Sequence, residues 1–180
     1  MKKIVLLMPF ILFSGEISVK KLINNYQRGH YKYVCLEGYK NFRILEKDED
    51  LLSMYAFSCL RSDYIDRLAV PLLILGKTKE SRKNRAYFSL ILAQKNILIS
   101  ALTDGEKYTN LHVPTSDHII SKVFNLYFQK KYKKIDNIYE FFDKNNKNCI
   151  YRVYIQYKKS RPFLVIEEIQ NKSKKIHIYR

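Results

Sequence analysis

The chain has 180 residues, of which 47% are hydrophobic, 28% charged and 14% aromatic. This balance excludes a disordered tail, a collagen-like rod and a polytopic membrane protein. With 33 Lys and Arg against 17 Asp and Glu, the formal net charge is +16 at pH 7. The length allows one domain, or two small ones that share a core, without a disulfide or metal to hold it.

The first fifteen residues have the order of a secretory signal peptide. Lys2 and Lys3 precede an apolar run over residues 4–13, and Ser14 and Gly15 follow it. Ten residues of helix reach only about 15 Å, half the thickness of a bilayer core. We therefore predict a cleaved signal peptide over residues 1–15 and a periplasmic or secreted protein. The alternative is a buried strand or helix at the N-terminus.

Charge is unevenly distributed along the rest of the chain. Residues 16–106 carry 15 basic and 11 acidic side chains, whereas residues 107–180 carry 16 and six. This excess favours attraction of the second part to acidic partners, anionic lipid or nucleic acid. The alternative is a lysine-rich composition on a solvated surface. We predict two parts, helical over residues 16–106 and basic over residues 107–180.

The first part shows helical periodicity. Apolar residues three and four positions apart predict a helix that begins behind Ser18 and ends at Gly29. The acidic residues 48–50 suit the positive start of a later helix. The further helices are predicted over residues 31–45, 51–60, 62–76 (with a bend at Pro71), 81–94 and 97–102.

These helix pairs recur at a fixed interval. Tyr26, Cys59 and Leu92 lie 33 residues apart, a period typical of stacked helical hairpins. Residues 26–31 resemble the turn between the two helices of a tetratricopeptide-type repeat, and Val34 lies near that family's small-residue position. The resemblance covers residues 18–102. It implies a TPR-like stack that serves as a scaffold for protein contacts.

The second part changes from helical to strand periodicity. Ser116 begins an amphipathic helix that the basic run over residues 130–134 ends. Alternating residues then predict strands over 149–157, 163–169 and 176–179, and a further strand or helix end over 138–143. The fold class is therefore α+β, with N-terminal helical hairpins, then a helix and an antiparallel meander of three to four strands.

Two of the three cysteines fall in successive predicted helices. Cys35 and Cys59 could form a disulfide in an oxidising compartment. The alternative is that both are small core residues, as free cysteines often are.

The sequence carries no recognisable catalytic motif. Its five scattered glycines allow no glycine-rich phosphate loop. The best polar constellation is His112, Asp117 and His118, which a metal- or histidine-dependent enzyme could use. Residues 115–117 are equally explained as helix-start residues. We expect no catalytic residue, no metal and no cofactor.

Basic residues interleaved with tyrosine give the strongest binding signal. They could neutralise the phosphates of nucleic acid or anionic lipid, or simply keep a helix end and a hairpin soluble. Expected export and the scarcity of Arg disfavour nucleic acid. The candidate binding residues are Lys130, Lys131, Tyr132, Lys133, Lys134, Lys158, Lys159 and Arg161.

Taken together, these features predict an exported, non-catalytic interaction or scaffold protein. Its expected partner is another protein of the cell envelope, with an anionic membrane surface as a second possibility. The alternatives are a basic module for nucleic acid or anionic lipid, and an enzyme at His112, Asp117 and His118.

Overall fold

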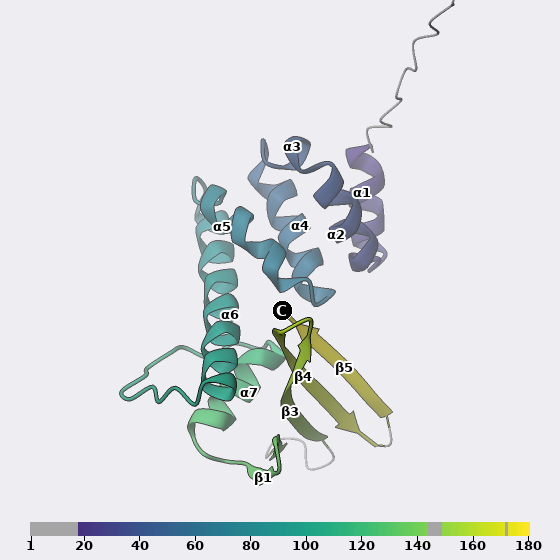
Figure 1. Ribbon diagram of the computed structural model, residues 1–180. Helices are drawn as coiled ribbons and strands as arrows, with labels where there is room; N and C mark the ends of the chain where they lie inside the picture. The colour runs from purple at the N-terminus through teal and green to yellow at the C-terminus, as the bar shows by residue number, and fades with distance from the viewer. Residues whose placement is uncertain (1–17, 144–148, 172) are drawn as a thin grey trace, which may run out of the picture.

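The computed structural model describes residues 18–143, 149–171 and 173–180. The predicted signal peptide lies outside these residues. Helices come first and strands last, so the fold is α+β with a C-terminal antiparallel meander, as the sequence predicted (Figure 1). The helices are α1 (Val19–Gln27), α2 (Tyr31–Lys40), α3 (Phe42–Leu45), α4 (Glu49–Arg61), the 3-10 helix η1 (Ile65–Leu68), α5 (Ala69–Ile74), α6 (Lys79–Thr103) and α7 (Ile119–Phe128). The strands are β1 (Lys133–Ile135), β2 (Ile138–Phe142), β3 (Cys149–Lys158), β4 (Arg161–Gln170) and β5 (Ser173–Tyr179).

The acidic start of α4 has the predicted capping role. The carboxylate of Asp48 accepts hydrogen bonds from the N–H groups of Asp50 and Leu51 at 2.8 and 3.1 Å. Glu49 reaches across to the loop before α6, where its carboxylate accepts from the backbone N–H groups of residues 76–78. These N–H donors, with that of Lys77 first, lower the pKa of Glu49 to about 2.

Several helix boundaries differ from the sequence prediction. The segments 81–94 and 97–102 form one continuous helix, α6, because no glycine or proline interrupts residues 79–103. The predicted helix over 62–76 is reduced to η1 and α5, since Asp63 adopts a left-handed conformation (φ 65°) that ends the preceding helix. The helix over 31–45 divides at Asn41, which leaves the helical conformation (φ −111°, ψ 28°).

The central helix of the molecule is α6. It contacts α4, α5, η1, α7, β3 and β4, with Phe88, Ile91 and Leu98 fully buried. Within the described ranges it is also the one helix long and apolar enough to cross a membrane. One third of its most apolar 18-residue stretch is buried, and a helix within a folded domain can have the same length and hydropathy.

The sheet has the strand order β1-β2-β3-β4-β5, and every neighbouring pair is antiparallel. Of the residues 138–143, which the sequence left as strand or helix end, Ile138–Phe142 form strand β2 of the sheet. The described chain also contains a strand that the sequence prediction missed. Strand β1 begins at Lys133, in the basic run that was expected only to end a helix, and extends to Ile135. The helix ends because Lys130 adopts a left-handed conformation (φ 55°), and the chain then returns as a strand.

One face of the sheet packs against the helices. The register aligns Val153 with Ile166 and Ile166 with His177, so these three side chains share that face. Val153 and Ile166 are fully buried and belong to the same hydrophobic cluster as Phe88 of α6. A continuous core therefore joins the helical part to the sheet.

Helix α2 packs against both α1 and α4, with the short helix α3 in the connection between α2 and α4. Such packing occurs in many helical folds, so the tetratricopeptide resemblance stays a prediction.

Candidate binding groove

A groove of about 1600 Å³ lies between the helical part and the last two strands. Residues of α2, α3 and the turn after α4 line one side, and residues of β4 and β5 line the other. In Figure 1 the chain ends below α4, where β5 meets the helical part. The groove thus lies where the two parts of the fold meet.

Apolar side chains are exposed along this groove. Ile176 and Ile178 of β5 are 49% and 40% exposed, while the alternating residues His177 and Tyr179 are buried. Tyr39 of α2 is 61% exposed on the opposite side. Water-exposed apolar surface in a concave site is the usual basis of binding affinity.

Basic side chains outnumber acidic side chains around the groove. Five Lys and Arg side chains line it, against the three acidic side chains of Glu37, Asp63 and Asp66. Glu37 and Asp66 each contact a lysine, at 2.7 and 2.8 Å. Lys32 and Arg43 have no ion-pair partner in the part of the chain that the structure describes. The groove therefore presents a positive potential to a ligand.

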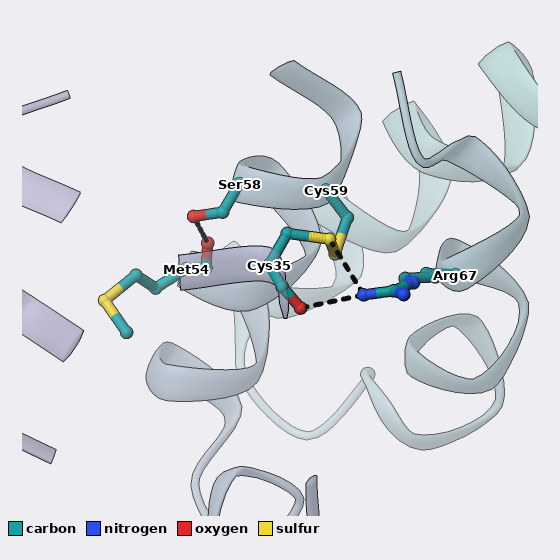
Figure 2. Close-up of a disulfide and its surroundings, with 5 residues drawn as sticks. All are labelled: Cys35, Met54, Ser58, Cys59 and Arg67. Atoms are coloured by element: carbon teal, nitrogen blue, oxygen red, sulfur yellow. Dashed lines mark hydrogen bonds between the residues drawn. A yellow bond between two sulfur atoms is a disulfide. The ribbon is translucent and has the colours of Figure 1, made fainter. Parts of the chain in front are cut away.

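Arg67 of η1 is held in the groove wall by aromatic rings. Its guanidinium group lies over the rings of Tyr39 and Tyr64, at 4.4 and 4.8 Å from their centroids. It also donates a hydrogen bond to the carbonyl oxygen of Cys35 at 3.1 Å (Figure 2). These contacts fix the direction of a cation that would otherwise be mobile.

A disulfide connects the two helices behind Arg67. The structure joins Cys35 of α2 to Cys59 of α4, with an S–S distance of 2.09 Å (Figure 2). The sequence alone allowed either this disulfide or two free thiols in the core. Both cysteines are fully buried, so the bond also belongs to the core of the helical part.

Close packing of α2 on α4 depends on Gly38. A Cβ atom at this position would lie 2.5 Å from Cδ2 of Tyr55, so only glycine allows the approach. The Tyr55 side chain is buried, and burial raises the pKa of its hydroxyl to about 12. Tyr55 therefore stays neutral and acts as a packing residue of the groove wall.

Two side-chain contacts tie the helical part to the end of β5. The Nδ1 atom of His177 lies 2.9 Å from Oδ1 of Asp63. Lys95 of α6, which is buried, contacts the carboxylate of Asp66 at 2.8 Å and also the carbonyl oxygen of Arg180. The two sides of the groove are thereby held in a fixed relation.

The constellation predicted from the sequence at His112, Asp117 and His118 is not assembled. His112 is exposed in the connector before α7, while Asp117 and His118 line a second cavity without it. Asp117 accepts a hydrogen bond from Tyr87 at 2.9 Å, and His118 accepts the N–H of Ile120 as the N-cap of α7. Burial is the main cause that lowers the pKa of His118 to about 4. Among the described residues, no three His, Cys, Asp or Glu side chains have an arrangement that could hold a metal ion.

The predicted cluster at residues 130–134 is divided between surface and core. Tyr132 packs against the core, with its ring 5.5 Å from Tyr127 and 5.0 Å from Tyr139. Lys134 lies over the ring of Tyr139 at 5.2 Å. Lys130, Lys131 and Lys133 are exposed. Tyr132 is thus engaged in packing and is not free to stack on a ligand.

The second predicted cluster forms the hairpin between β3 and β4. Lys158 of β3 and Arg161 of β4 are opposite each other in the strand register, and Lys159 is exposed in the turn between them. Lys133 of β1 pairs with Glu140 of β2, and Glu140 pairs with Arg152 of β3. Arg152 lies six residues before Lys158 in the same strand. At ~3.3 Å per strand residue, the two clusters lie about 20 Å apart along the sheet. They do not form one patch.

The groove residues were not found from the sequence. Lys32, Arg43 and Arg67 come from the helical part and Ile176 and Ile178 from the last strand, so no local motif joins them. One signal was present: Ile176 and Ile178 alternate with His177 and Tyr179 at the end of the chain. Neither a family model nor a curated protein nor a solved structure matches this chain.

Proposed function

We propose that this protein is an exported, non-catalytic interaction protein that binds an acidic, partly apolar segment of another envelope protein. The observation that carries the proposal is the groove, in which exposed apolar side chains lie beside cations that have no acidic partner among the described residues. Apolar contacts supply affinity in such sites, and complementary charge supplies orientation and a fast encounter.

An extended segment fits this groove best. β5 is the last strand of the described sheet, so its outer edge has no strand beside it. A partner strand could add to this edge through main-chain hydrogen bonds, with alternate side chains on Ile176 and Ile178. Acidic side chains on the same segment would lie close to Lys32 and Arg43 across the groove.

The disulfide supports the proposal that the protein is exported to an oxidising compartment. A bond such as Cys35–Cys59 persists in the periplasm or outside the cell and is rare in a reducing cytosol. The signal peptide predicted over residues 1–15 leads to the same compartment. Fusion of residues 1–20 to a reporter that is active only in the periplasm tests this part. A silent reporter would contradict export.

The binding part is tested with defined peptides. We expect a fluorescent peptide of alternating Leu and Glu to bind the mature protein, and a matched peptide of alternating Leu and Lys not to bind. The double variant K32E/R43E should lower the affinity for the acidic peptide at least about tenfold in a fluorescence anisotropy titration. Affinity should also fall as salt rises, because the cations are solvent-exposed.

A matched control separates the groove from general charge. The variant K130E/K131E changes the net charge equally at two exposed lysines outside the groove. It should leave peptide affinity within about twofold of the unmodified protein. An equal loss in both variants would show that net charge alone attracts the peptide. The absence of binding to either peptide would refute the groove proposal.

A further inference from the structure

The face of the sheet opposite the core-facing one is rich in apolar side chains. Alternate residues of a strand lie on opposite faces, so this outer face carries the residues next in sequence to Val153, Ile166 and His177. An antiparallel sheet with one face on the core commonly has a polar second face. Here the outer face carries the side chains of Ile135, Ile138, Phe142, Ile150, Tyr154, Phe163, Val165, Ile169, Ile176 and Ile178.

The apolar side chains of the outer face gather into a cluster of their own. Val165 is only 1% exposed, yet it does not belong to the hydrophobic cluster that joins the helices to the sheet. Its neighbours in the register are Tyr154 and Ile178, so side chains of the outer face itself cover it. Further along the same face, Ile135 and Phe142 are 45% and 56% exposed. Apolar surface gathered in this way is typical of a site of protein association.

The charged side chains of the outer face form one row across four strands. The register places Lys133 of β1 beside Glu140 of β2, and the row continues through Arg152 of β3 to Glu167 of β4. Arg152 contacts Glu140 at 2.8 Å, and Lys174 contacts Glu167 at 2.6 Å. The row therefore alternates positive, negative, positive, negative. It is neutral overall, in a chain whose net charge is +16.

An alternating row of four charges is complementary to itself. A two-fold axis parallel to the strands, between β2 and β3, would place each strand over the strand equally far on the other side of the axis. Glu140 would then lie opposite Arg152 of a second copy, and Lys133 opposite Glu167 of that copy. Stacked sheets pack about 10 Å apart with their strands within about 30° of each other. The match is therefore closest near the axis, at Glu140 and Arg152.

The apolar residues on both sides of this row obey the same symmetry. Two residues along the strands, Ile135 pairs with Ile138, and Tyr154 pairs with Val165. The two-fold axis would place Ile138 over Tyr154 of the second copy, and Ile135 over its Val165. On the other side of the charges the next row is also apolar, with Phe142, Ile150 and Ile169. Apolar rows thus meet apolar rows, and charges meet opposite charges.

We propose that the outer face binds a second copy of this chain and forms a symmetric dimer about an axis between β2 and β3. The apolar rows supply affinity, and the charged row fixes the orientation. Glu140 and Arg152 are already paired within each chain, so the dimer buries neither charge without a partner. Strand β5 lies outside the overlap and the groove stays open, so this interface goes beyond the proposed binding of a peptide segment.

Sedimentation equilibrium at about 0.15 M salt tests the dimer, over about 1 to 100 µM protein. We expect the mass to rise with concentration from that of one chain to that of two. I138K introduces a charge at a 37% exposed position of the outer face, and it should raise the dissociation constant at least about tenfold. The matched control L73K makes a comparable change at exposed Leu73 of α5, outside this face, and should dimerise normally. A protein that stays monomeric, or equal effects of the two variants, would overturn the proposal.

A mixing experiment tests the position of the axis. E140R makes both central positions of the row positive, and R152E makes both negative, so each variant alone should dimerise about tenfold more weakly. An equimolar mixture should recover the affinity of the unmodified protein, because every central contact of the mixed dimer joins opposite charges. The ion pair within each chain remains broken in both variants, so only contact between copies explains recovery. A mixture that dimerises no better than its components would overturn the assigned axis.

The dimer and the groove are tested separately. I138K, which lies outside the groove, should bind the acidic peptide as the unmodified protein does. The groove variant K32E/R43E should dimerise normally. Failure of one proposal is therefore distinguishable from failure of the other.

Discussion

The carboxylate of Asp63 and the imidazole of His177 form a contact of 2.9 Å between residues 114 positions apart. Asp63 lies in the turn after α4, and His177 lies in the last strand. Asp63 lines both the groove and the second cavity, so this contact stands between the two concave sites. It also connects the helical part of the fold to the sheet.

Replacement of Asp63 should therefore destabilise the fold. In D63A the imidazole N–H of His177 loses its acceptor in a buried place, which costs about 1 to 3 kcal/mol. Alanine also tolerates the left-handed conformation at φ 65° poorly. D63N keeps an oxygen acceptor and a side chain that tolerates this conformation, so it should lose less. Urea unfolding of both variants measures the difference, and a D63A protein as stable as D63N would refute the argument.

The Cys35–Cys59 disulfide should contribute substantially to stability. The bond closes a loop between residues 24 positions apart, for which the chain-entropy treatment gives about 3 kcal/mol. We expect C35A/C59A, or reduction of the unmodified protein, to lower the free energy of unfolding by that order.

Cys149 supplies the control for this prediction. It is buried and is the free cysteine of the described chain. The stability of C149A should remain sensitive to reductant, while that of C35A/C59A should not. Equal denaturant midpoints for the oxidised and reduced unmodified protein would contradict the prediction.

Gly38 should tolerate no side chain while Tyr55 is present. In G38A the new Cβ atom would lie 2.5 Å from the Tyr55 ring, so α2 or the ring must move, at a cost of about 1 to 3 kcal/mol. Elsewhere in a helix, the same change from glycine to alanine stabilises by up to about 1 kcal/mol. In a Y55L background the ring is absent, and G38A should cost much less. Denaturant unfolding of the four proteins gives this coupling, and additive effects would contradict the proposed clash.

The fold class could be predicted from the sequence because local patterns determine it. Apolar spacing identified the helices up to α4, and alternation identified β3, β4 and β5 near their observed bounds. Two of the errors occurred where a single backbone conformation decides the outcome. Asp63 and Lys130 both adopt a positive φ angle, and neither residue type signals this as glycine does.

The candidate sites could not be predicted in the same way. The groove and the cavity are built from residues far apart in the chain, such as Arg67 with Ile176 and His118 with His177. The basic clusters were visible because their members are adjacent in sequence, yet Tyr132 is used in packing. Adjacency in sequence identifies solvated charge more readily than a concave site, which depends on tertiary contacts.

Acid should destabilise the fold over two pH ranges that overlap only between pH 4.5 and 4. Burial lowers the pKa of His118 to about 4, below the ordinary value of 6.5 that it has in the unfolded chain. Between these values the unfolded chain binds more protons than the folded one, so stability falls as pH drops from 6.5 to 4. The loss attributable to His118 is at most about 3 kcal/mol. Glu49, with its pKa of about 2 against 4.5, adds a further loss only between pH 4.5 and 2.

The variant H118N tests the loss of stability between pH 6.5 and 4 that is assigned to His118. Asparagine keeps an acceptor for the N–H of Ile120 as the N-cap of α7, but it does not titrate. The free energy of unfolding of H118N should therefore vary less between pH 6.5 and 4 than that of the unmodified protein, while the loss below pH 4.5 persists. E49Q should show the opposite pattern, since it removes only the loss of stability between pH 4.5 and 2. Parallel pH profiles for H118N and the unmodified protein would show that His118 is not the group responsible.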